Sequence, residues 1–166
     1  MAMVLAMLSS AVLAMSANAA VPPPEEGDDR TAILVAVNAL LDRLGTADGE
    51  QFREVLSPEG TIFIHNLMDT ADPQLIVRSN AIMTERAAPG DQQLTEKMGI
   101  PTVLQRGDMA HVWAPYAVWI EGEKTHCGMN SLSLSRSLGV WRVTNLSYTV
   151  EPTDRCAELG APESPE

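Results

Sequence analysis

The stretch MAHVWAPYAVWIEGEKTHCGMNSLSLSRSLGVWRVTNLSYTV, residues 109–150, decides the fold. It alternates long runs rich in β-branched and aromatic residues with short turns that contain glycine, a pattern typical of consecutive strands. Because such short turns leave no room for a crossover, we expect the strands to pair as antiparallel neighbours. With the run before it, the expected strands are Gln92 to Arg106, Met109 to Ile120, Thr125 to Ser137 and Val140 to Val150.

The segment before these strands has helical spacing. Apolar residues recur at helical intervals over residues 31–44, which predicts an amphipathic helix. Residues 48–51 form a capping-box-like pattern that starts a second helix, and Pro58 ends it. A β-rich run at 61–65 and a third helix over 79–87 follow. Helices followed by strands predict an α+β fold with the helices packed on one face of a sheet.

The two ends of the chain differ in composition from this single domain. Residues 1–19 carry no charged side chain and end in a small-x-small pattern, which predicts a cleaved signal peptide and a secreted or periplasmic protein. Residues 20–30 are expected to be an acidic, proline-rich linker and residues 157–166 an acidic disordered tail. The folded domain is therefore expected over residues 31–156.

The charge of the chain excludes two classes of partner. There are 22 acidic against 11 basic residues, a formal net charge of -11. Non-specific binding to nucleic acid or to an anionic membrane surface needs clustered Lys and Arg, so neither partner is expected once the signal peptide is cleaved. The three His have no ligand-type spacing and the sequence has no phosphate-binding loop, so no metal and no cofactor is expected.

Two parts of the sequence carry a family resemblance. The first is LGTADGEQFREVLSPEGTIF, residues 44–63, and the second combines VWAPYAVW at 112–119 with THCG at 125–128. They resemble the nuclear transport factor 2-like superfamily, in its exported SnoaL-like and lumazine-binding-like branch. The resemblance implies a cone-shaped, curved antiparallel β-sheet wrapped around a pocket, with the N-terminal helices packed on its concave face.

That superfamily includes isomerases, polyketide cyclases and dehydratases beside non-catalytic modules, so the fold leaves the function open. We expect an exported protein that binds a small organic ligand in a partly apolar pocket or serves as a scaffold. One alternative is a cofactor-independent lyase, isomerase or cyclase with His126 or Glu96 as base and Tyr116 as proton donor. Another is an assembly module with a filled interior. The predicted ligand-binding residues are Trp113, Tyr116, Trp119, His126 and Asn130.

The strand at 109–120 is apolar on both faces. One face is expected to line the pocket and core, and the other needs a cover, which predicts a homodimer through the sheet. Pro115 is expected to mark a β-bulge that changes the register midway along this strand.

Cys127 and Cys156 are the two cysteines of the chain, and in an exported protein they are expected to form a disulfide. The last hairpin places Cys127 opposite about Val150, and the residues that follow can fold back to bring Cys156 alongside. The alternative is that His126 activates Cys127 as a thiolate nucleophile. Adjacent strand residues point to opposite faces, which favours the disulfide.

Overall fold

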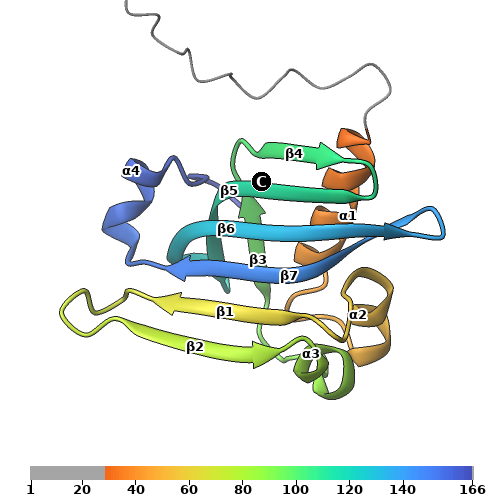
Figure 1. Ribbon diagram of the computed structural model, residues 1–166. Coiled ribbons are helices and arrows are strands. Elements are labelled where there is room, and N and C mark those ends of the chain that lie inside the picture. Colours follow the sequence, from red (N-terminus) through yellow and green to blue (C-terminus); the bar gives the residue numbers. More distant parts are fainter. Residues whose placement is uncertain (1–28, 166) are drawn as a thin grey trace, which may run out of the picture.

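The structure, a computed structural model, describes residues 29–165 (Figure 1). The predicted signal peptide and nearly all of the predicted linker lie outside the described residues. No helix of the described part is long and apolar enough to cross a membrane. The helices are α1 (Arg30–Leu41), α2 (Gly49–Val55), α3 (Ala81–Arg86) and α4 (Cys156–Leu159), with a 3₁₀ turn at Thr153–Arg155. The strands are β1 (Thr61–Asn66), β2 (Gln74–Ser79), β3 (Leu94–Met98), β4 (Thr102–Arg106), β5 (Met109–Ile120), β6 (Glu123–Ser137) and β7 (Val140–Val150).

The first two helices form where the sequence predicts them. Asp48 and Gln51 exchange side-chain to backbone hydrogen bonds, which completes the capping box of α2. At the start of α1, the Asp29 carboxylate instead accepts hydrogen bonds from Arg136 and Gln105, which ties this helix to the sheet. The apolar stripe of α1 is buried at Ile33, Ala36, Val37, Leu40 and Leu41.

Seven strands form one sheet in the order β2-β1-β7-β6-β5-β3, with β4 also pairing with β5. The predicted strand at 92–106 is interrupted at residues 99–101, so β3 and β4 pair with opposite halves of β5. β1 and β7 are parallel, so the sheet is mixed and not wholly antiparallel as expected. The chain leaves α2 alongside β7, where the Ser57 amide donates to the Val143 carbonyl, and it therefore enters β1 in the direction of β7. The sequence pattern did not predict β2, which forms a hairpin with β1.

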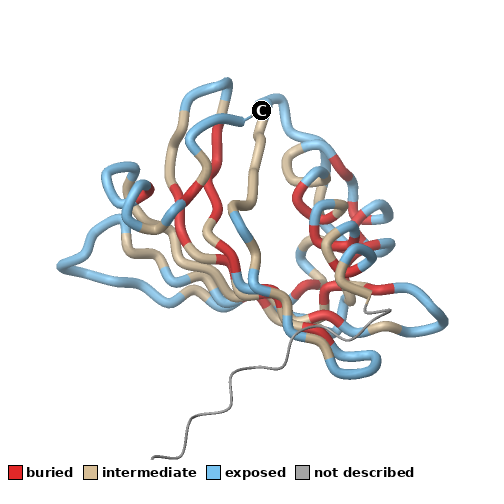
Figure 2. Tube along the Cα trace, turned by 90° about the horizontal axis from the view of Figure 1, so that it is seen from above, coloured by how far each residue is buried: buried red, intermediate tan, exposed pale blue. Residues whose placement is uncertain are grey.

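The sheet is curved, and the N-terminal helices pack on its concave face as predicted (Figures 1 and 2). Two register shifts bend the strands, one between Val118 and Trp119 where β5 meets β6, and one between Ser133 and Leu134 where β6 meets β7. The main core lies between the helices and the strands that face them, where Figure 2 shows buried residues on both layers.

Pro115 does not mark a register shift, so that prediction is wrong. It pairs regularly with Met129 of β6. Its carbonyl accepts a hydrogen bond of 2.7 Å from the Gly99 amide, on the side of β5 where β3 gives way to β4. The backbone nitrogen and carbonyl of one strand residue point to the same side, so the N–H that proline lacks would have faced this interruption. β5 therefore tolerates Pro115 without a bulge.

The C-terminal segment packs on the domain, which corrects the expected disordered tail for residues 157–165. Helix α4 begins at Cys156, and Ala161 after it is buried. The Lys124 ammonium donates to the Pro162 carbonyl at 2.9 Å. The segment covers the convex face of the sheet around Trp119, opposite the face that the N-terminal helices cover.

Candidate functional site

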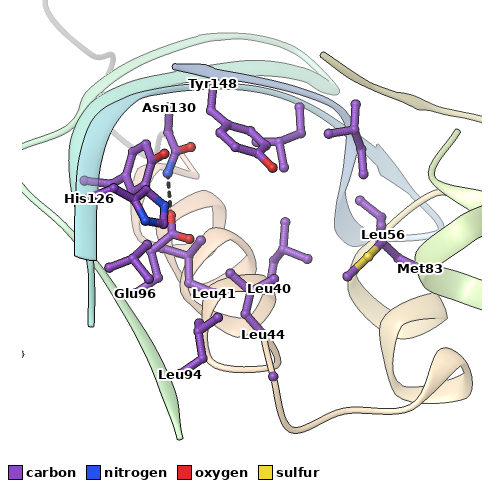
Figure 3. Close-up of a pocket in the computed structure, with 15 residues that line it drawn as sticks. Leu40, Leu41, Leu44, Leu56, Met83, Leu94, Glu96, His126, Asn130 and Tyr148 are labelled. Atoms are coloured by element: carbon purple, nitrogen blue, oxygen red, sulfur yellow. Dashed lines mark hydrogen bonds between the residues drawn. The ribbon is translucent and has the colours of Figure 1, made fainter. Parts of the chain in front are cut away.

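A cavity of about 370 Å³ lies between α1 and the concave face of the sheet (Figure 3). An assembly module without a ligand would have an interior filled by side chains. The interior of this domain is open instead. The apolar wall consists of Leu40, Leu41, Leu44, Gly45, Leu56, Ile62, Met83, Leu94, Val118 and Leu146. The polar and aromatic groups are Glu96, Tyr116, His126, Asn130 and Tyr148.

The strand register brings the polar residues together from different strands. Glu96 on β3 lies opposite Val118 on β5, which lies opposite His126 on β6. On the same face, beyond the row in which Tyr116 lies opposite Gly128, Asn130 on β6 lies opposite Tyr148 on β7. Residues opposite one another share a face of the sheet, so these side chains all point into the concave side.

Glu96 is the carboxyl group of the cavity. Asn130 Nδ2 donates to Glu96 Oε1 at 2.7 Å (Figure 3). Burial raises the pKa of Glu96 to about 7, and the hydrogen bond from Asn130 opposes that rise only in part. Glu96 is therefore divided between its neutral and ionised forms near neutral pH. The sequence offered Glu96 as a possible base without deciding whether it points inward, and the structure places it inside.

Tyr116 is in the cavity wall as predicted, but its hydroxyl is engaged elsewhere. It donates to the Thr149 carbonyl at 2.6 Å. Burial, with a contribution from the charge of Glu96, raises the pKa of Tyr116. Gly128 makes this approach possible, since a Cβ there would lie 2.0 Å from the Thr149 carbonyl oxygen. Tyr116 is thus held as a structural hydrogen-bond donor, which does not suit the predicted role of proton donor.

His126 lies beside Glu96 in the cavity (Figure 3). Its Nδ1 is 3.0 Å from the Thr125 hydroxyl, and its ring meets the edge of the Tyr116 ring with centroids 6.0 Å apart. Burial lowers the pKa of His126, so the imidazole is neutral near pH 7. It adds no positive charge to the cavity.

Tyr148 is the polar residue of the cavity that sequence reasoning missed. Its hydroxyl makes no hydrogen bond within the part of the chain that the structure describes, and Figure 3 shows it directed into the cavity. Burial raises the pKa of Tyr148, and the charge of Glu96 adds to the rise. Leu146 and Tyr148 are two residues apart on β7 and therefore share one face of the strand. This spacing was the signal in the sequence that could have placed Tyr148 in the cavity with Leu146.

Two of the five predicted ligand-binding residues, Trp113 and Trp119, lie outside the cavity. Each of them is three residues from Tyr116 along β5, and side chains an odd number of residues apart point to opposite faces of a strand. They therefore point to the convex face. Trp113 is 48% exposed there, opposite Ser131. Trp119 is buried under the C-terminal segment, with the Lys124 ammonium 5.4 Å from its ring centroid.

The predicted disulfide between Cys127 and Cys156 is present, with their Cα atoms 5.6 Å apart. Cys127 pairs with Glu151, one residue beyond the expected Val150. The bridge lies on the convex face, whereas His126 points into the cavity. The alternative of a nucleophilic Cys127 is therefore wrong.

Among residues 29–165, no group of three or more His, Cys, Asp or Glu side chains is placed to hold a metal ion. The groups that face the cavity are one carboxyl, one neutral imidazole, one amide and two phenols. This set can exchange hydrogen bonds and one proton with a bound molecule.

No protein-family model and no curated protein matches the sequence. Solved structures share the fold at low identity. A nuclear transport factor 2-like protein from Cytophaga hutchinsonii is 15% identical, with a TM-score of 0.59 over 74% of this chain and 98% of that chain. A protein from Novosphingobium aromaticivorans, described as the beta subunit of an aromatic-ring-hydroxylating dioxygenase, is 16% identical, with a TM-score of 0.58 over 73% and 88%. A nuclear transport factor 2-like superfamily protein from Salmonella enterica is 16% identical, with a TM-score of 0.56 over 75% and 92%.

Proposed function

We propose that this chain, which has the nuclear transport factor 2-like fold, binds a small, mostly apolar molecule in the cavity between α1 and the sheet. The observation that carries the proposal is the open interior of about 370 Å³ with one polar corner at Glu96. Ligand sites of proteins start at about 300 Å³ and combine apolar walls with a few placed polar groups. The cavity therefore has the size and the composition of a binding site for one compact organic molecule.

Filling the cavity is expected to abolish binding. Val118 faces the cavity and is 4% exposed, so Val118→Trp puts an indole into the space that the ligand needs. The probe is N-phenyl-naphthylamine, an uncharged dye whose fluorescence rises in apolar surroundings. We expect the variant to bind the dye at least about tenfold more weakly than the parent.

The matched control is Val140→Trp, because Val140 is 46% exposed and lies outside the cavity. It is expected to bind the dye as the parent does. Circular dichroism and thermal melting establish that both variants fold. Equal binding by the two folded variants would place the dye elsewhere on the molecule and refute the proposed site.

Acid–base catalysis is a second candidate function, favoured by the Glu96 carboxyl whose pKa is about 7. In this role the Glu96 carboxylate removes a proton next to a carbonyl, and the Tyr148 hydroxyl, in place of Tyr116, donates to the resulting oxyanion. Exchange of the protons next to the carbonyl of tetralone in D₂O, followed by NMR, separates the candidates. Exchange above the buffer rate that Glu96→Gln or His126→Ala removes supports catalysis, and bound tetralone without exchange supports binding alone.

A homodimer through the convex face of the sheet is also part of the proposal. The row Val77, Phe63, Ser147, Ser131 and Trp113 crosses five strands and carries no charge. Val77, Phe63 and Trp113 are 49%, 38% and 48% exposed. A chain with a net charge of -11 repels its own copy, so an uncharged surface is where two copies can approach with the least repulsion.

Trp113→Glu is expected to convert the dimer to a monomer, because it places two like charges across the interface. The control is Ile100→Glu in the loop between β3 and β4, where Ile100 is 91% exposed. Light scattering at micromolar protein should give a dimer mass for the parent and the control, and a monomer mass for Trp113→Glu. A parent that is monomeric at that concentration contradicts the proposal.

Export completes the proposed function. The charge-free N-terminal residues support it, and so does the disulfide, because thiols are kept reduced in most cytosols. The likeness to the SnoaL-like and lumazine-binding-like branch remains a prediction from the sequence. The intact mass of protein from its own host checks the export, since cleavage at the predicted position leaves a chain that begins at Ala20.

A further inference from the structure

We propose that the molecule bound in this cavity carries a protonated nitrogen, and that Glu96 and Asn130 receive it. This inference rests on the proposed binding function and names the ligand class for the same site. Two observations support it. In the part of the chain that the structure describes, the cavity contains hydrogen-bond acceptors without a donor, and no positive charge lies beside Glu96 there.

The polar corner of the cavity presents acceptors. Asn130 uses its amide N–H to reach Glu96 Oε1, which turns its own carbonyl oxygen away as an acceptor. Within residues 29–165, the hydrogen bond between these two side chains uses Asn130 Nδ2 and Glu96 Oε1, and no donor reaches Asn130 Oδ1 or Glu96 Oε2. Both atoms belong to residues that line the cavity (Figure 3). An ammonium group offers several N–H donors at once and matches two adjacent acceptors better than a hydroxyl, which offers one.

The charges around Glu96 point to the same class of ligand. The titratable groups that face it are Tyr116 on β5, His126 on β6 and Tyr148 on β7, and α1 contributes only leucines to the cavity. None of them is a cation, since burial keeps His126 neutral. Lys97 neighbours Glu96 on β3, but it points to the opposite face of the sheet. An ionised Glu96 is therefore a buried negative charge without a counter-charge, which a cationic ligand supplies and an anionic ligand opposes.

Proton linkage gives the inference a second consequence. An ammonium ligand binds the ionised form of Glu96, whose pKa is about 7. Below that pH a proton must leave Glu96 before the ion pair forms, so the affinity for an amine is expected to fall by up to about tenfold for each further pH unit. A neutral ligand that accepts a hydrogen bond from protonated Glu96 has the opposite pH dependence.

Three probes of one skeleton test the inference: naphthylmethylamine, naphthylmethanol and naphthoate. Each competes with N-phenyl-naphthylamine for the cavity, or is titrated directly by calorimetry. At about pH 8 we expect the amine to bind at least about tenfold more tightly than the alcohol, and the naphthoate to bind more weakly than both. Glu96→Gln should remove the preference for the amine and its pH dependence while the alcohol still binds. Glu85→Gln, on an exposed face of α3, should keep both.

The outcomes separate this inference from the proposed function. If the alcohol binds as tightly as the amine, or binds more tightly as the pH falls, the cavity is a binding site but the nitrogen assignment is overturned. If the dye and all three probes fail to bind the folded parent, both the binding function and the ligand class are overturned. An amine preference that survives in Glu96→Gln removes Glu96 from the assignment and overturns it as well.

Discussion

Replacing both cysteines, Cys127→Ala with Cys156→Ala, is expected to lower the free energy of unfolding by about 3 to 4 kcal/mol. The two residues are 29 positions apart, so the bridge closes a loop that restricts the unfolded chain. The bridge also holds the C-terminal segment against the sheet, where Ala161 of that segment and Trp119 of β5 belong to one buried cluster. Urea unfolding of the parent and the double variant measures the difference.

Reduction provides the matched control for this substitution. The parent treated with dithiothreitol should approach the stability of the double variant, and the double variant should not respond to the reductant. Both cysteines are buried, and alanine leaves no polar group in their place. Equal urea midpoints for the oxidised parent and the double variant would show that the bridge contributes nothing to stability.

Glu96→Gln is expected to stabilise the protein at about pH 8 by about 1 to 3 kcal/mol and to have little effect near pH 4. The folded pKa of about 7 lies above the ordinary pKa of 4.5 for a free glutamate side chain, so the folded state holds a proton that the unfolded state releases. The parent therefore loses stability as the pH rises from about 4.5 through about 7, and the loss stays constant above that range. Glutamine keeps the hydrogen bond from Asn130 and cannot ionise. The cavity beside Glu96 has a volume of about 370 Å³ and is large enough to admit water, which would solvate part of the charge, so the expected gain starts near 1 kcal/mol.

The measurement is thermal or urea unfolding of the parent and the variant over this pH range. Glu85→Gln is the control, because Glu85 is exposed on α3 and its loss changes the net charge by the same amount. A stability gain that is equal in both variants at each pH would be an effect of net charge. A gain confined to Glu96→Gln and to the higher pH values identifies the buried carboxyl.

Local signals predicted much of the fold. The capping pair at 48–51, the apolar stripe of α1 and the glycine turns of the last two hairpins act over neighbouring residues, and each element forms where these signals place it. The disulfide was also within reach of the sequence, because alternation alone separates Cys127 from His126. Strand β2 was missed, although QLIVRS at 74–79 contains β-branched residues, since nothing in that run shows that β1 will be beside it.

The candidate site could be predicted only in part. Of the five predicted ligand-binding residues, Tyr116, His126 and Asn130 line the cavity, whereas Trp113 and Trp119 lie on the other face of the sheet. Aromatic character indicates burial or contact, but it does not say on which face of a strand the ring lies.

By itself the sequence determined an α+β domain, its first three helices, its last two hairpins, and the pairing of its cysteines, because these follow from contacts between residues close in the chain or on one side of a hairpin. Only the tertiary structure decided which side chains line the cavity. A strand alternates with period two, so a shift of one residue exchanges its faces. The shift between Ser133 and Leu134 places Tyr148 opposite Asn130, where an unbroken register from the last turn would place Ser147. Packing between distant elements sets such shifts, and it also turns Glu96 inward beneath α1.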